Sequence, residues 1–366
     1  MNKFLNNYLC GSLCFLRVPL CQNFYTENHR EGTENHRASV YVLGNPCIKH
    51  LFCCFLTIFF LASCRELVTK DFPYLAPSPV VHCILAEGEP LELQLSWTAA
   101  MDTARLKFIE NAQVRLFVDG EYAETLTHLQ KGFYVASCTV ASSVRYQCEI
   151  HIPGHETIIA SDSMPAALAP TNVQYIPVAG RDEEGYPYPA IRFTFANNPN
   201  EKRYYEAVIW EIRDNYKFEI NPETGEGEFI LIEDDWQTVY PGPVTDPILK
   251  SEGLPIHVFS NELIKGNEYT ITLNYTNGSF SSSDGGEWIA DSRPTILELR
   301  SVSYDYYRYA KQKYLYESNF FPEFGRSTPT FSLYSNIDKG YGIFAGYASV
   351  FSDTLNIQQK RIKNGK

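Results

Sequence analysis

The sequence predicts a mainly β protein with two antiparallel Ig-like β-sandwich domains and one C-terminal α-helix packed on the second. Three observations lead to this prediction. The chain has 25 Tyr and 23 Phe against only 3 Met, and aromatic residues are enriched in strands. Many short segments alternate apolar and polar residues between turn signals. A length of 366 residues suits two domains of ordinary size.

The first sandwich is expected over residues 80–165. An apolar segment at Val80–Leu85 is followed by Leu91–Leu95, in which leucines alternate with polar residues. Residues 114–118 and 146–150 repeat this alternation, and Asp-Gly after the former is a hairpin signal. Short strands at such spacing are typical of a sandwich with one buried face on each sheet.

The second β-rich domain is expected over residues 170–355. Its predicted strands lie at 191–195, 204–212, 216–220, 228–232, 269–275 and 296–299, and residues 334–347 are expected to form a turn followed by a last strand. Residues 304–316 have helical spacing without Gly or Pro, Ser303 is a suitable N-cap, and Asp305 lies in the first turn. The tyrosines of this helix are expected to pack, with a ligand platform as the alternative. Residues 356–366 form a basic tail expected to be disordered.

A secretory signal is expected at residues 49–63. Lys49-His50 precedes the apolar run Leu51–Leu61, and a run of about 7 to 15 apolar residues suits a signal peptide, whereas a spanning helix needs about 20. The sequence Leu61-Ala62-Ser63-Cys64 resembles a bacterial lipobox, which predicts lipidation of Cys64. The alternative is a plain signal peptide with an incidental cysteine. Residues 64–79, with three prolines, are expected to form a tether.

Residues 1–48 are unusual in front of such a signal, because signal peptides normally begin near the first residue. The stretch has four cysteines and a duplication, TENHR at 26–30 and at 33–37, but its His and Cys spacings fit no zinc pattern. We interpret it as a mis-called upstream extension, with translation starting near Ile48.

The charge of the chain argues against nucleic acid as a partner. The formal charge is −12, and without residues 1–63 the chain keeps 26 Lys and Arg against 40 Asp and Glu. A net charge of this sign repels phosphate backbones.

Three cysteines remain after Cys64, namely Cys83, Cys138 and Cys148. An exported protein folds in an oxidising compartment, where at most one disulfide can form from three thiols. Cys138 and Cys148 flank an expected turn and are the candidate pair, and buried unpaired thiols are the alternative.

No established catalytic motif occurs in the sequence. His151 and His155 are spaced i, i+4, but Pro153-Gly154 between them prevents the helix that would direct both to one metal. The acidic clusters 182–184 and 233–235 could form a glycosidase pair or a Ca²⁺ site, and water-facing loops are the preferred interpretation. Trp97, Trp210, Trp236 and Trp288 are candidates for a sugar platform. We predict no metal, no cofactor and no catalytic residue.

Several segments carry a family resemblance. The lipobox, Val80–Leu85, Ser303–Tyr309 (SYDYYRY) and above all Tyr334–Gly346 (YSNIDKGYGIFAG) resemble the Bacteroidota outer-membrane lipoproteins known as the domain of unknown function 4249 family. The resemblance implies an outer-membrane lipoprotein, frequently encoded beside TonB-dependent transporters, with no established enzymatic activity. It transfers no catalytic residue and no ligand.

The residues after Cys64 bear on location. Arg65 stands where an Asp would retain a lipoprotein in the inner membrane of many Gram-negative bacteria, so an outer-membrane location is favoured. Only Glu66 matches the acidic residues that follow the lipidated cysteine in surface-displayed Bacteroidota lipoproteins, so the periplasmic and external sides stay open.

The expected function is therefore a membrane-anchored binding or accessory protein of a TonB-dependent nutrient uptake system. Its expected partner is a TonB-dependent barrel transporter, and its ligand is not identified by the sequence. A structural or adhesive surface lipoprotein is one alternative, and an envelope enzyme is another.

Overall fold

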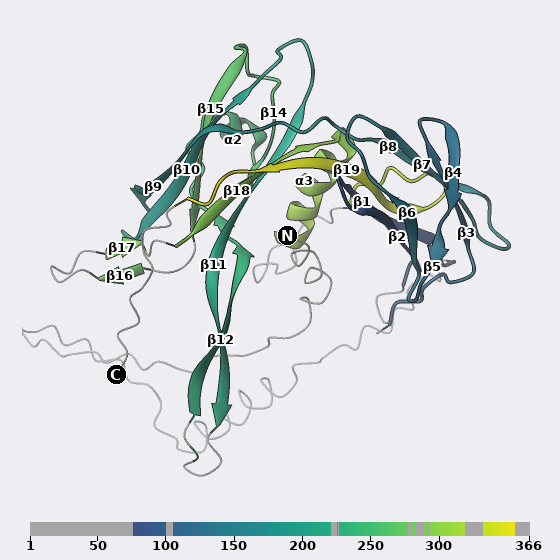
Figure 1. The fold of residues 1–366 in the computed structure, drawn as a ribbon, viewed down its shortest axis with the longest axis horizontal. Coiled ribbons are helices and arrows are strands. Elements are labelled where there is room, and N and C mark those ends of the chain that lie inside the picture. The colour runs from purple at the N-terminus through teal and green to yellow at the C-terminus, as the bar shows by residue number, and fades with distance from the viewer. Residues whose placement is uncertain are drawn as a thin grey trace, which may run out of the picture. The chain divides into compact units, whose positions relative to one another are not determined.

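The computed structural model describes residues 76–99, 105–220, 225, 227–276, 280–282, 288–290, 293–318 and 332–355. This part of the chain is mainly β, which confirms the mainly β part of the predicted fold class (Figure 1). None of its helices is long and apolar enough to span a bilayer.

The largest sheet has nine strands. Its order is β12 (Gly227–Thr238), β11 (Tyr204–Ile220), β18 (Thr295–Val302), β19 (Tyr341–Phe351), β1 (Pro79–Ala86), β2 (Pro90–Trp97), β6 (Phe133–Thr139) and β5 (Thr127–His128), with β14 (Val258–Ser260) pairing beside β11.

Three smaller sheets complete the described strands. One has the order β4 (Glu121–Thr125), β3 (Gln113–Val118), β7 (Arg145–His151) and β8 (Ile158–Ser163). Another has the order β13 (Tyr240–Pro241), β15 (Glu268–Thr276), β10 (Pro187–Ala196) and β9 (Thr171–Arg181). The third pairs β16 (Phe280–Ser282) with β17 (Trp288–Ala290), and the helices are α2 (Pro247–Glu252) and α3 (Tyr304–Ser318).

The alternating segments bury one face each, as their pattern predicts. In β2, Leu91, Leu93 and Leu95 are at most 1% exposed, and they belong to one core cluster with Val114 of β3 and Ile150 of β7. Burying each leucine contributes about 1.5–3 kcal/mol relative to an exposed side chain.

A second core cluster lies between the β15–β10 face and the β11–β18 face. Phe193 and Phe195 of β10 are fully buried there with Tyr205 of β11. The rings of Phe195 and Tyr205 are 5.2 Å apart, and Phe259 lies 5.8 Å from Phe195. Many side chains of this cluster are aromatic, in agreement with the Tyr- and Phe-rich composition of the chain.

Strand β19 serves both halves of the structure. Its residues 341–347 pair in parallel with β1, from Val80↔Tyr341 to Ala86↔Tyr347. Its residues 347–351 pair antiparallel with β18, from Val302↔Tyr347 to Glu298↔Phe351. Phe344 and the preceding Ile337 belong to the first core cluster, so the segment expected to end the second domain also completes the first core.

Helix α3 begins after Ser303, whose hydroxyl accepts a hydrogen bond from the backbone N–H of Tyr306 at 3.2 Å, as expected of an N-cap. Two of its tyrosines, Tyr306 and Tyr307, contact the sheet, whereas Tyr304 and Tyr316 are exposed. The Tyr307 ring lies 4.8 Å from that of Tyr204 in β11, and the Tyr306 hydroxyl donates to Glu206 at 2.7 Å.

Candidate functional site

The predicted lipidation site, Cys64, lies outside the described residues, as do the expected leader 49–63, the extension 1–48 and the tail 356–366. The sequence-predicted residues that the structure does describe fall into several separate places.

The candidate disulfide between Cys138 and Cys148 is not present in the structure, where Cys83, Cys138 and Cys148 are free thiols. Cys148 is buried on β7, whereas Cys138 lies on β6 in the other sheet, near Glu124. Burial and the neighbouring Cys138 raise the pKa of Cys148 to about 12. The first core therefore holds protonated thiols that behave as small apolar side chains.

The two predicted histidines do not converge on a metal. His151 Nδ1 lies 2.9 Å from Thr157 Oγ1, whereas the His155 ring lies 4.8 Å from the ring of Trp97. Among the residues that the structure describes, no group of three or more His, Cys, Asp or Glu is placed to hold a metal ion.

The acidic clusters also lie apart, on different sheets. Asp182 belongs to the turn between β9 and β10, where its carboxylate accepts from the Tyr186 N–H at 2.7 Å. Residues 233–235 belong to β12, and Asp235 is opposite Arg213 of β11. The structure does not assemble them into a carboxylate pair.

The tryptophans are divided between two sheets, with three in the nine-stranded sheet and Trp288 in the sheet of β16 and β17. Trp210 of β11 and Trp236 of β12 are diagonal neighbours in the register, and Trp210 donates its indole N–H to Glu298 at 2.9 Å. Trp97 belongs to β2 and Trp288 to β17. The four residues therefore do not form a single sugar platform.

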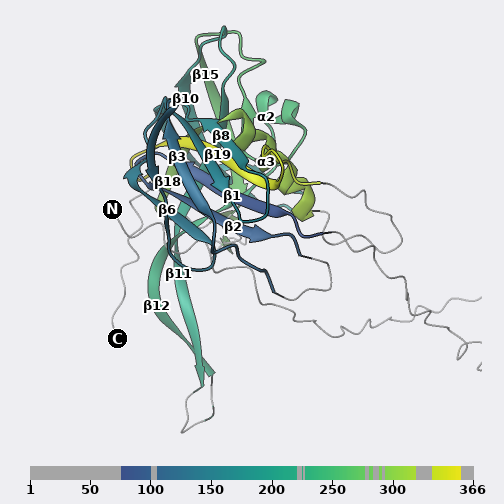
Figure 2. The ribbon, with the colours of Figure 1, turned by 90° about the vertical axis from the view of Figure 1, so that its right-hand side faces the viewer.

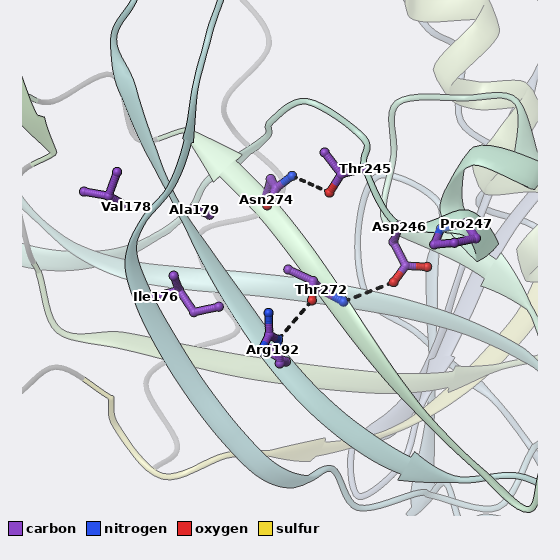
Figure 3. A pocket seen from close by; sticks show the side chains of 9 residues that line it. All are labelled: Ile176, Val178, Ala179, Arg192, Thr245, Asp246, Pro247, Thr272 and Asn274. Atoms are coloured by element: carbon purple, nitrogen blue, oxygen red, sulfur yellow. Dashed lines mark hydrogen bonds between the residues drawn. The ribbon is translucent and has the colours of Figure 1, made fainter.

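A cavity of about 480 Å³ lies on the outer face of the sheet formed by β13, β15, β10 and β9 (Figure 3). A volume of this size suits a small ligand. Its wall consists of Ile176, Val178 and Ala179 from β9, Arg192 from β10, Thr272 and Asn274 from β15, and the segment Thr245–Pro247 before α2.

Asp246 builds one wall of this cavity. As the N-cap of α2 it accepts from the Ile248 N–H at 2.9 Å, and its carboxylate also accepts from the Tyr269 hydroxyl at 3.1 Å and the Thr272 N–H at 3.3 Å. Burial and the Asp246 charge raise the pKa of Tyr269 to about 12. Asp246 is 7% exposed. Its carboxylate accepts these three hydrogen bonds, which stabilise the wall.

Asn274 and His257 support the same wall, where the segment before α2 lies along β15. The Asn274 amide donates to the Pro243 carbonyl at 2.7 Å and to Thr245 Oγ1 at 2.9 Å. Behind it, His257 Nε2 lies 3.2 Å from the Asn274 carbonyl oxygen. Burial lowers the pKa of His257 to about 4, so the ring is neutral near pH 7 and acts as a support for this wall.

Arg192 is the cationic group of the cavity. It is exposed, and among the described residues its one hydrogen-bond partner is Thr272 Oγ1, 3.3 Å from Nε. The remaining guanidinium N–H groups can therefore bind a carboxylate or phosphate. Beside it, Val178 is 49% exposed and offers apolar contact. The arrangement can hold a small anion with an aliphatic part, and it contains no nucleophile paired with a general base.

A buried ionic cluster that the sequence analysis did not identify lies under α3. Arg300 of β18 donates to both Glu298 oxygens at 2.8 and 2.9 Å and to Glu206 at 2.9 Å. Burial and the Glu206 charge raise the pKa of Tyr306, which donates to the same Glu206 oxygen. All these charges are paired, so the cluster ties α3 to β11 and β18. Alternating Glu and Arg on one strand was the only signal in the sequence.

The segment Tyr334–Gly346, which carries the family resemblance, also has a structural role. The Asn336 amide donates to the Phe344 carbonyl at 2.7 Å and to Asp305 of α3 at 3.0 Å, and its oxygen accepts from the Phe344 N–H at 3.0 Å. Gly342 has φ +114°, and a Cβ there would lie 1.9 Å from the Val81 carbonyl oxygen of β1. These residues hold β19 between α3 and β1. The close approach of β1 leaves no room for a side chain at position 342, so glycine is required there.

Comparison with known protein families gives a match that includes the segment Tyr334–Gly346. A family model described as a domain of unknown function (DUF4249) matches residues 66–351. A search of curated proteins finds no match. Because the family model covers most of the chain, the chain belongs to the DUF4249 family of domains of unknown function.

Proposed function

We propose that this protein is an outer-membrane lipoprotein of the Bacteroidota type that acts as a binding or accessory component of a TonB-dependent nutrient uptake system. The observation that carries the proposal is the sequence Leu61-Ala62-Ser63-Cys64, which follows an apolar run and precedes the folded body. The family match supports the same assignment.

Lipidation would give the body a firm attachment to the membrane. One acyl chain binds a bilayer only marginally, whereas two or more anchor stably, because each buried CH₂ contributes about 0.8 kcal/mol. Between Cys64 and the first described residue, Ala76, lies a short segment with a proline at position 73. Confinement near the membrane raises the effective concentration of the body for a membrane partner.

The proposed role of the body is capture without chemistry. Each of its two halves is proposed to be an Ig-like sandwich, because two sheets enclose each core cluster. The cavity beside Arg192 supports binding, since its cation is exposed while Asp246 is occupied by three donors. A small anionic nutrient is the ligand class that such a wall accommodates.

The anchor is tested with a Cys64→Ser variant in cells fed labelled palmitate. We expect the unmodified protein to take up label and to fractionate with outer membranes, and the variant to lose both properties. Cys54→Ser, a change within the apolar run, is the matched control and should retain both. Absence of label in the unmodified protein would refute the anchor.

The partner is tested by affinity purification through a C-terminal tag from membranes solubilised in mild detergent. A TonB-dependent barrel should be recovered with the unmodified protein, and less of it with Cys64→Ser. Purification that recovers no barrel protein would contradict the uptake role and would favour the structural or adhesive alternative.

A further inference from the structure

The hairpin of β11 and β12 continues beyond the nine-stranded sheet. Strand β18 pairs with β11 only from Tyr204 to Glu211. From Ile212 to Ile220, the described neighbour of β11 is β12 alone, and both views show this ribbon extending away from the other labelled strands (Figures 1 and 2). We call residues 212–220 and 227–236 the ribbon.

The register gives the ribbon two unlike faces. Phe218 is opposite Phe229, and Ile220 is opposite Gly227, on one face. Phe218 is 54% exposed and Ile220 is 64% exposed. On the other face, Lys217 is opposite Ile230 and Glu219 is opposite Glu228, and Lys217 pairs with Glu219 at 2.6 Å. Two exposed apolar side chains, Phe218 and Ile220, thus lie on one face of the ribbon, and one, Ile230, lies on the other.

The ribbon also has a free backbone edge. Strand β12 is the terminal strand of the nine-stranded sheet, and no described strand pairs with its outer side. Proteins protect such an edge with charged residues, Pro or β-bulges, and β12 has carboxylates at 233–235 and a register shift opposite Asn215 and Tyr216. Residues 227–231 lie outside this shift and contain one charge, Glu228, and no Lys, Arg or Pro. A two-stranded ribbon is only marginally stable in water, and a third strand with an apolar face stabilises it.

Charge identifies the kind of strand that fits. Strand β12 has carboxylates at Glu228, Glu233, Asp234 and Asp235 and no cation. Pairing β12 with a second copy of β12 would bring eight carboxylates into one strand pair, and like charges on facing strands are destabilising. Opposite charges across strands are favourable.

We propose that the outer edge of β12 binds an extended segment of another protein in which apolar residues alternate with Lys or Arg. The bound segment becomes a third strand of the ribbon beside β12 and extends the face on which Phe218 and Ile220 lie. Main-chain hydrogen bonds supply affinity in this mode, and alternate side chains supply specificity. The inference rests on the proposed function only for the identity of the partner, a barrel transporter.

The test is site-specific photo-crosslinking in cells that make the full-length protein. A photoreactive amino acid replaces Ile230, which is 43% exposed, and the matched control replaces Tyr122, which is 53% exposed on the edge strand β4. We expect a crosslink at position 230 and none at 122. Mass spectrometry should map it to a segment of another protein with alternating apolar and basic residues.

A charge-reversing variant makes the test specific. Glu228→Lys should lower the crosslink yield at position 230 by about tenfold, because it replaces an attractive cross-strand pair by a repulsive one. Glu121→Lys on β4 should leave the yield unchanged. Both variants are checked for an unchanged melting temperature, so that misfolding is detected.

Four results would overturn the inference: no crosslink, a crosslink to lipid, a crosslink to a second copy of this chain, or a yield insensitive to Glu228→Lys. If tag purification recovers a barrel and position 230 yields nothing, the proposed function stands and the ribbon assignment fails. If position 230 reaches a basic strand of a protein that is not a barrel, the ribbon assignment stands and the uptake role fails.

Discussion

Replacing Asn336 by Ala should strongly destabilise the fold. The amide satisfies both the N–H and the C=O of Phe344, whose side chain is fully buried in the first core. Leaving a buried polar group unpaired costs about 1–3 kcal/mol, so two such groups correspond to a loss of about 2–6 kcal/mol. The lost bond to Asp305 adds to this cost. We expect a decrease in the free energy of unfolding near the middle of that range.

The assay is equilibrium unfolding in urea, followed by tryptophan fluorescence, on the full chain carrying Cys64→Ser for solubility. Asn198→Ala is the matched control, because the described hydrogen bonds of the Asn198 amide, to Glu201 and Asn200, are solvent-exposed. The control should stay within about 0.5 kcal/mol of the parent, as surface substitutions usually do. A loss below about 1 kcal/mol for Asn336→Ala would refute the role assigned to the amide.

Three further predictions concern the same half of the structure. Burial raises the pKa of Asp162 to about 6, so stability should fall as the pH rises from about 4 to 6 and the carboxyl must ionise. Asp162→Asn should flatten this part of the stability profile, and an unchanged slope would contradict the assignment. Gly342→Ala should abolish folding or cost more than about 3 kcal/mol, because it adds backbone strain and a clash, and a variant as resistant to proteolysis as the parent would refute this. Thiol titration in denaturant should find Cys83, Cys138 and Cys148 all free, and a loss of two thiols reversed by reductant would instead indicate the disulfide.

Local patterns were sufficient to predict that the described chain is mainly β and where many of its strands lie. Leu91, Leu93 and Leu95 alternate with polar residues in the sequence, and they are buried in the structure. The pattern works because successive side chains of a strand point to opposite faces. The same reasoning places Arg192 on the face opposite Phe193, where it is exposed.

Long-range partners could not be predicted from such patterns. The cavity beside Arg192 exists because Arg192 of β10, the segment Thr245–Pro247 and Thr272 of β15, which are far apart in the sequence, meet on one sheet face. Likewise, Cys138 and Cys148 are close in sequence around a turn, but their strands enter different sheets. Proximity is therefore not sufficient for a disulfide, because these neighbouring thiols lie on strands of different sheets and are free.

The pairing of β19 with β1 has a consequence for how the chain folds. Strand β1 begins at Pro79, but its parallel neighbour begins at Tyr341, so one side of β1 stays open until nearly the whole polypeptide has been synthesised. Contacts between such distant residues form slowly, because a long loop must close before they stabilise anything. Until β19 has been synthesised, the first core lacks its last strand, and the open side of β1 is prone to aggregation.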